Sequence, residues 1–454
     1  MKYVLLCLWL CGCAQGSVQA QTIRFEKDSL NQVLTKAKQQ NKPVLVILKP
    51  PVGAADSPLS AKAPSRKTGL LAPAVVTTLD KEFFVKEVDF ESAEAPALVA
   101  RFQVVSYPTY LYFNPEGNLL YRSLGESTNE VRYLRDLQAF RQAEADPHTL
   151  GYYQREFKNG NRAPEFLRQY LLKRRTLGQW VEPDLLDTYA QQLPAKAFDR
   201  AEEVVFILEF GPVLDSRAYQ LTHLNGPLID SLYKNLPLPQ RIRFNNLIIN
   251  NTLAQAIATK NVRLAATGAA FARASWMSNY QRGAQAYAYK MVTFYRGVKD
   301  TANYLRQAVS YYDRYYMNIS VDSARRRVLA TMKGRQAAAD TAQRQAADTY
   351  VVAVSTEGLP TTYTMALNNT AWSVYQTGTR RRTYLQPAVQ WSRRTIELDP
   401  TAPYYDTLAH LLYRLQLYDE AMATQRQAIA HARAQKNAVA VYEKELVKMR
   451  NRLL

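Results

Sequence analysis

All three cysteines of this 454-residue chain lie at its very start, at Cys7, Cys11 and Cys13. Residues 14–454 contain no thiol, so no disulfide can connect elements of the folded protein there, and no cysteine pair can carry out redox chemistry. The fold must therefore depend on noncovalent packing alone. The length is sufficient for this, because roughly two to four domains of about 100–200 residues each can bury real hydrophobic cores.

Residues 1–20 have the three-part layout of a secretory signal peptide. Lys2 precedes an apolar run, Tyr3–Cys13. Small or polar residues follow this run and end with Ser17–Ala20. We predict cleavage after Ala20 and export to the periplasm. The alternative is a lipoprotein, retained at a membrane through a lipidated Cys13. The apolar run itself is too short to span a bilayer, which takes about 20 residues.

Composition and charge limit the class of protein. Hydrophobic residues make up 47% and charged residues 21% of the chain, so neither general disorder nor a multi-span membrane protein fits. The net charge of +19 favours contact with polyanionic surfaces. The basic runs Lys173–Arg175, Arg325–Arg327 and Arg380–Arg382 either bind an anionic ligand or form solvated helix faces, and we favour solvated faces. No nucleic-acid partner is expected, because export separates the chain from nucleic acid and no nucleic-acid-binding module is found.

Residues 21–145 predict a domain in which helices and strands alternate. The apolar run Val44–Leu48 is typical of a strand buried on both faces, and Asn114–Asn118 has the composition of a hairpin turn. Ser127 and Glu130 have the spacing of a capping box at the start of a closing helix. The other predicted elements are strands at 23–25, 84–89, 110–113 and 119–123 and helices at 29–39, 70–79 and 95–102.

This order of elements resembles the thioredoxin fold, and local sequences agree with it. The segment Phe84–Asp89, followed by Ser106-Tyr107-Pro108-Thr109 before an apolar strand, carries most of the resemblance. In that family the proline is cis and shapes a groove for an extended substrate chain. The resemblance therefore implies that Ser106, Tyr107, Pro108 and Thr109 contact a partner. The alternative is an ordinary trans proline at the start of a strand.

The resemblance also implies a missing activity. Thioredoxin-family enzymes carry Cys-x-x-Cys just after the second strand, and counting from Lys42-Pro43 places Gly53, Ala54, Ala55 and Asp56 at those positions. The buried acidic residue of the family falls on Ile47. We therefore expect no catalytic residue, no thiol enzyme activity and no cofactor.

Residues 146–355 predict a helical region, and residues 356–454 resemble tetratricopeptide repeats. Two helix pairs carry this resemblance, with alanines at Ala388 and Ala421 separated by 33 positions. Such repeats usually hold a peptide or protein on a concave surface, here around Trp372, Trp391 and Tyr405. The four histidines are scattered without metal-ligand spacing, so no metal site is expected.

Together these features predict an exported, redox-inactive protein with an α/β thioredoxin-like domain followed by an all-α tetratricopeptide-like solenoid. We expect it to bind a polypeptide partner in the cell envelope, as a scaffold or in a chaperone-like role. Two alternatives remain open: an enzyme that uses non-thiol chemistry, and a structural subunit of an envelope complex. An enzyme would have a pocket with convergent polar groups, whereas a binding protein would have an open groove.

Overall fold

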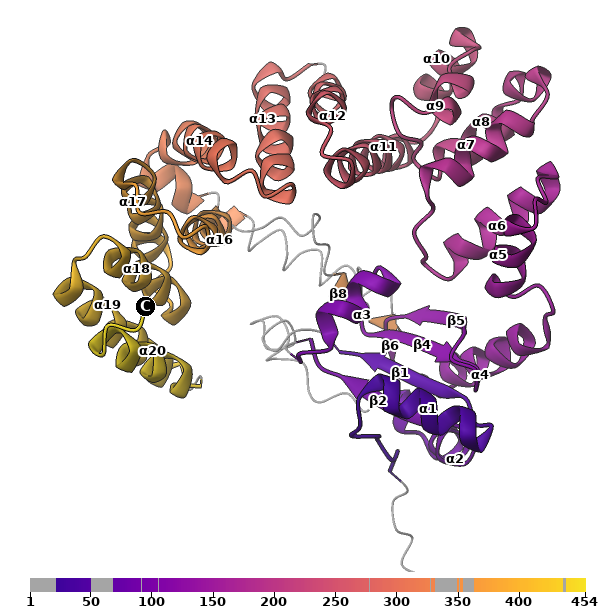
Figure 1. The fold of residues 1–454 in the computed structure, drawn as a ribbon, viewed down its shortest axis with the longest axis horizontal. Coiled ribbons are helices and arrows are strands. Elements are labelled where there is room, and N and C mark those ends of the chain that lie inside the picture. The colour runs from indigo at the N-terminus through magenta and orange to yellow at the C-terminus, as the bar shows by residue number, and fades with distance from the viewer. Residues whose placement is uncertain are drawn as a thin grey trace, which may run out of the picture. The chain divides into compact units, whose positions relative to one another are not determined.

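The computed structural model describes ten segments of the chain, which are residues 22–49, 68–90, 92–104, 106–276, 278–326, 328–330, 349–350, 352–353, 363–435 and 438–454. The predicted signal peptide and the Gly53–Asp56 positions lie outside them. The described residues fall into two compact units, one within Met1–Pro147 and Ala346–Val352, the other within His148–Gln345 and Ala353–Leu454 (Figure 1).

The first unit is built on a mixed four-stranded sheet in the order β2-β1-β4-β5. β1 pairs in parallel with β2, with Val44 opposite Phe84, and antiparallel with β4, which pairs antiparallel with β5. Every residue of β1 and of β4 is buried, as expected for central strands covered on both faces. The strand bounds are β1 Val44–Leu48, β2 Phe84–Val88, β4 Thr109–Phe113 and β5 Leu119–Leu124.

Helices cover this sheet and complete its core. Leu45 and Ile47 of β1 share one apolar cluster with Val75 of α2 and with Tyr133 and Phe140 of α4. At the start of α1 the amide of Ser29 donates to Gln32 Oε1 at 3.0 Å. The helix bounds are α1 Leu30–Gln40, η1 Gly69–Leu71, α2 Pro73–Glu82, α3 Ala95–Phe102 and α4 Glu130–Ala145.

Two local predictions are corrected. The predicted strand at 23–25 is reduced to a single bridge between Phe25 and Val85. The capping box is also wrong: Asn129 caps α4 by accepting from the Val131 amide at 2.9 Å, while Ser127 Oγ accepts from the Asn129 amide at 3.0 Å. Ser127 lies two positions before the N-cap residue because it belongs to the strand β6 rather than to the helix start.

The predicted hairpin turn is confirmed. The amide of Gly117 donates to the Asn114 carbonyl at 2.9 Å, and the amide of Asn118 donates to Asn114 Oδ1 at 2.8 Å. Gly117 has a φ of 80°, a conformation that a residue without a Cβ adopts at no steric cost.

Two very short strand pairs extend the first unit, and they bring in chain from far away in the sequence. β6 (Glu126–Ser127) pairs antiparallel with β7 (Thr349–Tyr350). β3 (Ser106–Tyr107) is the hydrogen-bonded neighbour of β8 (Val352–Ala353), a strand that begins in the same unit. The prediction of a helical region throughout 146–355 is therefore wrong at these positions, because an uncharged run rich in β-branched residues has a strong strand preference.

The second unit consists mainly of helices connected by short turns. Such turns lie at Asn159–Asn161, between α5 and α6, and at Leu236–Pro237, between α10 and α11. The helix bounds are α5 Leu150–Lys158, α6 Pro164–Thr176, α7 Pro183–Gln192, η2 Ala195–Asp199, α8 Ala201–Leu208, α9 Arg217–Thr222, α10 Gly226–Asn235, α11 Leu238–Ala258, α12 Val262–Ala274, α13 Tyr280–Gly297, α14 Thr301–Tyr312, η3 Asp313–Met317, α16 Tyr363–Gln376, α17 Arg382–Leu398, α18 Ala402–Arg414, α19 Tyr418–Ala434 and α20 Ala440–Arg450.

The alanines that the sequence places at helix contacts are buried. Ala388 of α17 and Ala421 of α19 are both fully buried within one apolar cluster. Ala308 of α14 belongs to the same cluster. Small side chains at these positions let neighbouring helices approach closely, since no side-chain volume separates their backbones.

Candidate functional site

The segment Ser106–Thr109 forms a sharp connection between β3 and β4. The peptide bond between Tyr107 and Pro108 is cis, as the resemblance implied. The hydroxyl of Thr109 donates to the Ser106 carbonyl at 2.5 Å, so the segment closes on itself. The segment leads directly into β4, which is one of the two central strands of the sheet.

The side chains of this segment do not face solvent. Ser106, Tyr107 and Thr109 are all buried, and burial raises the pKa of the Tyr107 phenol above its usual range. The Tyr107 ring packs edge-on against Phe90 with 5.6 Å between ring centroids. Phe90 is 37% exposed, so it is the apolar side chain that remains accessible next to Tyr107. A partner at this segment must therefore use backbone groups and neighbouring surface rather than these side chains.

The backbone of this segment contacts the turn that follows β5. The amide of Gly125 donates to the Pro108 carbonyl at 2.8 Å, and Gly125 has a φ of 82°. Thr109 also pairs with Leu124 at the end of the β4–β5 ladder. The end of β3 and the start of β6 therefore lie next to each other, one on either side of this contact.

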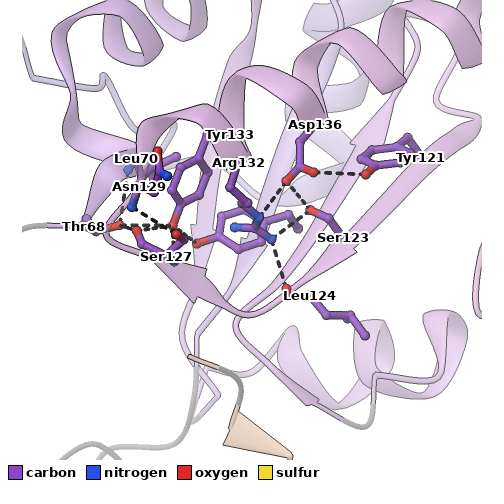
Figure 2. Close-up of polar contacts among 11 residues, drawn as sticks. Thr68, Leu70, Tyr121, Ser123, Leu124, Ser127, Asn129, Arg132, Tyr133 and Asp136 are labelled. Carbon is purple, nitrogen blue, oxygen red and sulfur yellow. Dashed lines mark hydrogen bonds and ion pairs between the residues drawn. The ribbon is translucent and has the colours of Figure 1, made fainter. Parts of the chain in front are cut away.

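Tyr133 of α4 holds β6 in place, as Figure 2 shows. Its hydroxyl accepts from the Ser127 amide at 3.0 Å and lies 3.1 Å from Thr68 Oγ1 and 3.5 Å from the Tyr110 hydroxyl. The same hydroxyl lies 3.3 Å from the Ser127 carbonyl. One phenol oxygen thus connects the helix, the sheet and the short strand.

A buried ion pair lies next to this contact (Figure 2). Arg132 Nε is 3.1 Å from Asp136 Oδ2, and Arg132 Nη2 donates to the Leu124 carbonyl at 3.0 Å. Asp136 accepts from the hydroxyls of Ser123 and Tyr121 at 2.8 and 3.0 Å. Burial, followed by the Asp136 carboxylate, raises the pKa of Tyr121 to about 12. The ion pair fixes the end of β5 and so the direction in which the chain enters β6.

The position of the family's buried acid carries no ionisable group. Ile47 is a buried β1 residue that contributes to the apolar cluster of the sheet. The Gly53, Ala54, Ala55 and Asp56 positions, which the resemblance places where Cys-x-x-Cys would stand, lie outside the described residues.

The three aromatic residues expected on a concave helical surface have different environments. Trp391 is fully buried and donates from Nε1 to Asp313 Oδ1 at 2.8 Å, so it is part of the core and cannot contact a partner. Its place in the expected surface is therefore wrong, because an indole at a helix contact buries its large apolar area first. Trp372 is half-buried and stacks on Tyr375 with 5.0 Å between centroids.

Tyr405 is half-buried and borders an open hollow of about 250 Å³ between α17, α18 and α19. Ile396 and Leu408 line its apolar part, and an ion pair between Arg393 and Glu420, at 2.9 Å, lies at its border. The hollow is shallow and its surface is mainly apolar.

His410 is the most buried histidine among the described residues. It belongs to a polar network that joins α18, α19 and α20. Its Nδ1 is 2.8 Å from the Asp406 carbonyl and its Nε2 is 3.4 Å from Glu445 Oε2. Gln425 Nε2 donates to Asp406 Oδ1 at 2.7 Å. Burial raises the pKa of the Asp406 carboxyl. These contacts join three helices and are largely buried, which is typical of a structural network. Among the described residues, no group of three His, Cys, Asp or Glu side chains has a metal-binding arrangement.

The basic runs differ from one another. Arg174 of the first run is buried and pairs with Glu182 at 2.8 Å, so this run is partly structural. Arg380, Arg381 and Arg382 are exposed at the turn between α16 and α17, as expected for a solvated surface.

Sequence analysis missed the strands β7 and β8. The signal was the uncharged run Thr349–Val354, whose β-branched content is typical of a strand. No helix within the described part of the chain has the length and apolar character needed to span a membrane. No protein-family model matches the chain, and no curated protein sequence is significantly similar to it.

Proposed function

We propose that this chain is an exported, redox-inactive protein with a thioredoxin-like domain and tetratricopeptide-like helices that binds a polypeptide partner in the cell envelope. The binding edge is formed by the backbone around Ser106–Thr109 and by β6. The role is that of a scaffold or a chaperone-like holder rather than of an enzyme.

One observation carries this proposal: the short strand ends on both sides of the Pro108–Gly125 contact take up extended chain. β6 pairs antiparallel with β7, and β3 is the hydrogen-bonded neighbour of β8. Backbone groups at the end of a strand accept any extended polypeptide, since the hydrogen bonds do not depend on side-chain identity. The mixed sheet order β2-β1-β4-β5 and the buried alanines of α17 and α19 support the two fold assignments.

The absence of a thiol from residues 14–454 supports redox inactivity. Disulfide exchange requires a thiolate that attacks a sulfur atom, and the exported chain, if cleaved after Ala20, contains none. Insulin reduction in the presence of dithiothreitol should therefore proceed no faster with the chain than without it. Measured turnover above the background would contradict this part of the proposal.

Polypeptide binding is tested with the full exported chain and a permanently unfolded probe, reduced and carboxymethylated lysozyme. Biolayer interferometry in 0.3 M NaCl, which screens the basic surface, should show saturable binding. Glu126→Pro removes a backbone N–H of β6, whereas Glu126→Ala keeps it. We expect Glu126→Pro to weaken binding about tenfold or more and Glu126→Ala to leave it nearly unchanged. The absence of binding by every variant would contradict the proposed function.

A further inference from the structure

The chain supplies its own occupant for the proposed binding edge. Glu126 of β6 lies opposite Tyr350, and Ser127 lies opposite Thr349. Hydrogen bonds alternate along an antiparallel pair, and the Ser127 amide already donates to the Tyr133 hydroxyl at 3.0 Å. Glu126 is therefore the β6 residue whose backbone groups point toward Tyr350.

A single extended run can meet both strand ends, because these ends are adjacent. The Gly125 amide donates to the Pro108 carbonyl at 2.8 Å, between the end of β3 and the start of β6. β7 and β8 are separated by one residue in the sequence and pair with β6 and β3, respectively. The two strands thus place Thr349–Tyr350 beside β6 and Val352–Ala353 beside β3, on either side of the contact between Pro108 and Gly125.

The sequence of this run suits that role. Thr349–Val354 reads Thr-Tyr-Val-Val-Ala-Val, which is uncharged and has four β-branched residues. Such residues favour the extended conformation, so the loss of conformational entropy when the chain pairs is small. The run lies between two helical parts of the second unit, so both of its ends are covalently tethered.

We propose that Thr349–Ala353 is a tethered occupant of the polypeptide-binding edge and that a partner must displace it to bind. This inference rests on the proposed function, because it assigns regulation to the same edge. The preferred partner segment is extended, uncharged and rich in β-branched residues, and it runs antiparallel to Glu126–Ser127. A partner of this kind reproduces the backbone contacts that β7 makes.

Tethering sets the strength of this competition. A segment that is covalently joined to the rest of the chain at both ends acts at an effective concentration on the order of millimolar. Against a free peptide that binds with a dissociation constant of about 0.1 mM, the tethered run should weaken apparent binding about tenfold. Release of the run should therefore strengthen binding by the same factor.

The first experiment tests occupancy itself, without any partner. Hydrogen exchange followed by mass spectrometry compares the full exported chain with Tyr350→Pro, which removes a backbone donor, and with Tyr350→Ala, which loses the same side chain and keeps the donor. We expect Tyr350→Pro to accelerate exchange at residues 124–128 and at 349–353, and Tyr350→Ala to leave it nearly unchanged. Unchanged exchange at 124–128 in Tyr350→Pro would overturn the inference.

The second experiment measures competition with a labelled peptide of the sequence Ala-Ala-Asp-Thr-Tyr-Val-Val-Ala-Val-Ser, residues 346–355. Fluorescence anisotropy should show about tenfold tighter binding to Tyr350→Pro than to the unaltered chain or to Tyr350→Ala. Equal binding by all three would overturn the inference while leaving the proposed function intact, provided that carboxymethylated lysozyme still binds. Failure of both probes with Tyr350→Pro would overturn the proposed function as well.

Discussion

The hydroxyl of Tyr133 lies 3.0 Å from the backbone nitrogen of Ser127 and accepts its hydrogen bond. Ser127 lies in β6 and Tyr133 lies in α4, which follows it in the sequence. Their contact determines which backbone groups of β6 remain available to a second strand. Since the Ser127 amide is already bound, the backbone of Glu126 is the part of β6 that can pair outward. A side chain in the core thus selects which backbone group faces the second strand.

Removal of that hydroxyl should loosen β6. Tyr133→Phe keeps the ring but leaves the buried Ser127 amide and the Thr68 hydroxyl without this oxygen. We expect a loss of about 1–3 kcal/mol in the free energy of unfolding, which is typical for a buried polar group that loses its partner. Urea denaturation measures it. Tyr280→Phe is the control, because Tyr280 is 82% exposed and should change stability by less than about 0.5 kcal/mol. Equal effects of the two substitutions would contradict the assigned role.

The buried ion pair should behave as a unit. Asp136→Leu alone leaves the Arg132 charge buried without its carboxylate and should cost about 3–5 kcal/mol. The double variant Arg132→Met with Asp136→Leu removes both charges and should be more stable than the single variant. A double-mutant cycle in urea measures the coupling. The exposed pair Arg433–Glu443, at 2.8 Å, is the comparison and should show a coupling of only about 0–1 kcal/mol. Additive effects at Arg132 and Asp136 would contradict this prediction.

Gly69 lies against the start of α4. An added Cβ at Gly69 would be 2.6 Å from the Asn129 carbonyl carbon and 2.7 Å from the Glu130 nitrogen, both of which are backbone atoms. Gly69→Ala should therefore destabilise the first unit by about 1–3 kcal/mol through overpacking. At Gly226 an added Cβ meets nothing within 4 Å, so Gly226→Ala should be neutral or slightly stabilising. Thermal unfolding of the two variants checks this, and a stable Gly69→Ala chain would rule out the close packing described here.

Trp391 should respond as a core residue. Trp391→Phe removes the hydrogen bond to Asp313, at 2.8 Å, and leaves space in a fully buried site. We expect a loss of about 2–4 kcal/mol and a loss of the most blue-shifted part of the tryptophan emission. Trp276→Phe provides the comparison, since Trp276 is 43% exposed and should matter little for stability. A neutral Trp391→Phe substitution would contradict the contribution to core stability assigned to this residue.

Stability at high pH should depend on Tyr121. Its pKa is about 12 in the folded chain, mainly because of burial and then the Asp136 carboxylate, whereas a tyrosine in an unfolded chain has a pKa of about 10. Between pH 10 and 12 the unfolded state holds fewer protons at this site, so the free energy of unfolding falls as pH rises. Tyr121→Phe should make the free energy of unfolding fall less steeply with pH, by an amount that corresponds to the release of up to about one proton. Urea titrations at fixed pH measure the slope, and the same slopes for both proteins over pH 10–12 would contradict the prediction.

The sequence predicted the first unit well wherever one local pattern decides the structure. Val44–Leu48 is a fully buried strand and Ala95–Phe102 is a helix with the expected bounds, because both follow from patterns of residues that are close together in the sequence. Asn114–Asn118 is a turn for the same reason, since its hydrogen bonds are local.

Prediction failed where distant residues decide. Ser127 and Glu130 have capping-box spacing, but Ser127 is bound to Tyr133 and paired with Thr349, which no local pattern reveals. Trp391 was expected on a surface because its helix carries a repeat pattern, yet its burial depends on Asp313, far away in the sequence. Side-chain exposure at Ser106–Thr109 also depends on tertiary packing, so the sequence could indicate the place of the site but not which of its atoms are accessible.

The strand β7 makes the first unit discontinuous in the sequence. During synthesis, the residues up to Pro147 emerge about 200 residues before Thr349, at a rate of about 5–20 residues per second. For that interval the edge of β6 has no intramolecular strand, and an unpaired edge is a template for joining another chain. A shortened protein that ends at Pro147 should therefore associate with itself more readily than the complete chain. The time between synthesis of β6 and synthesis of β7 is thus the period in which this edge is most prone to aggregation.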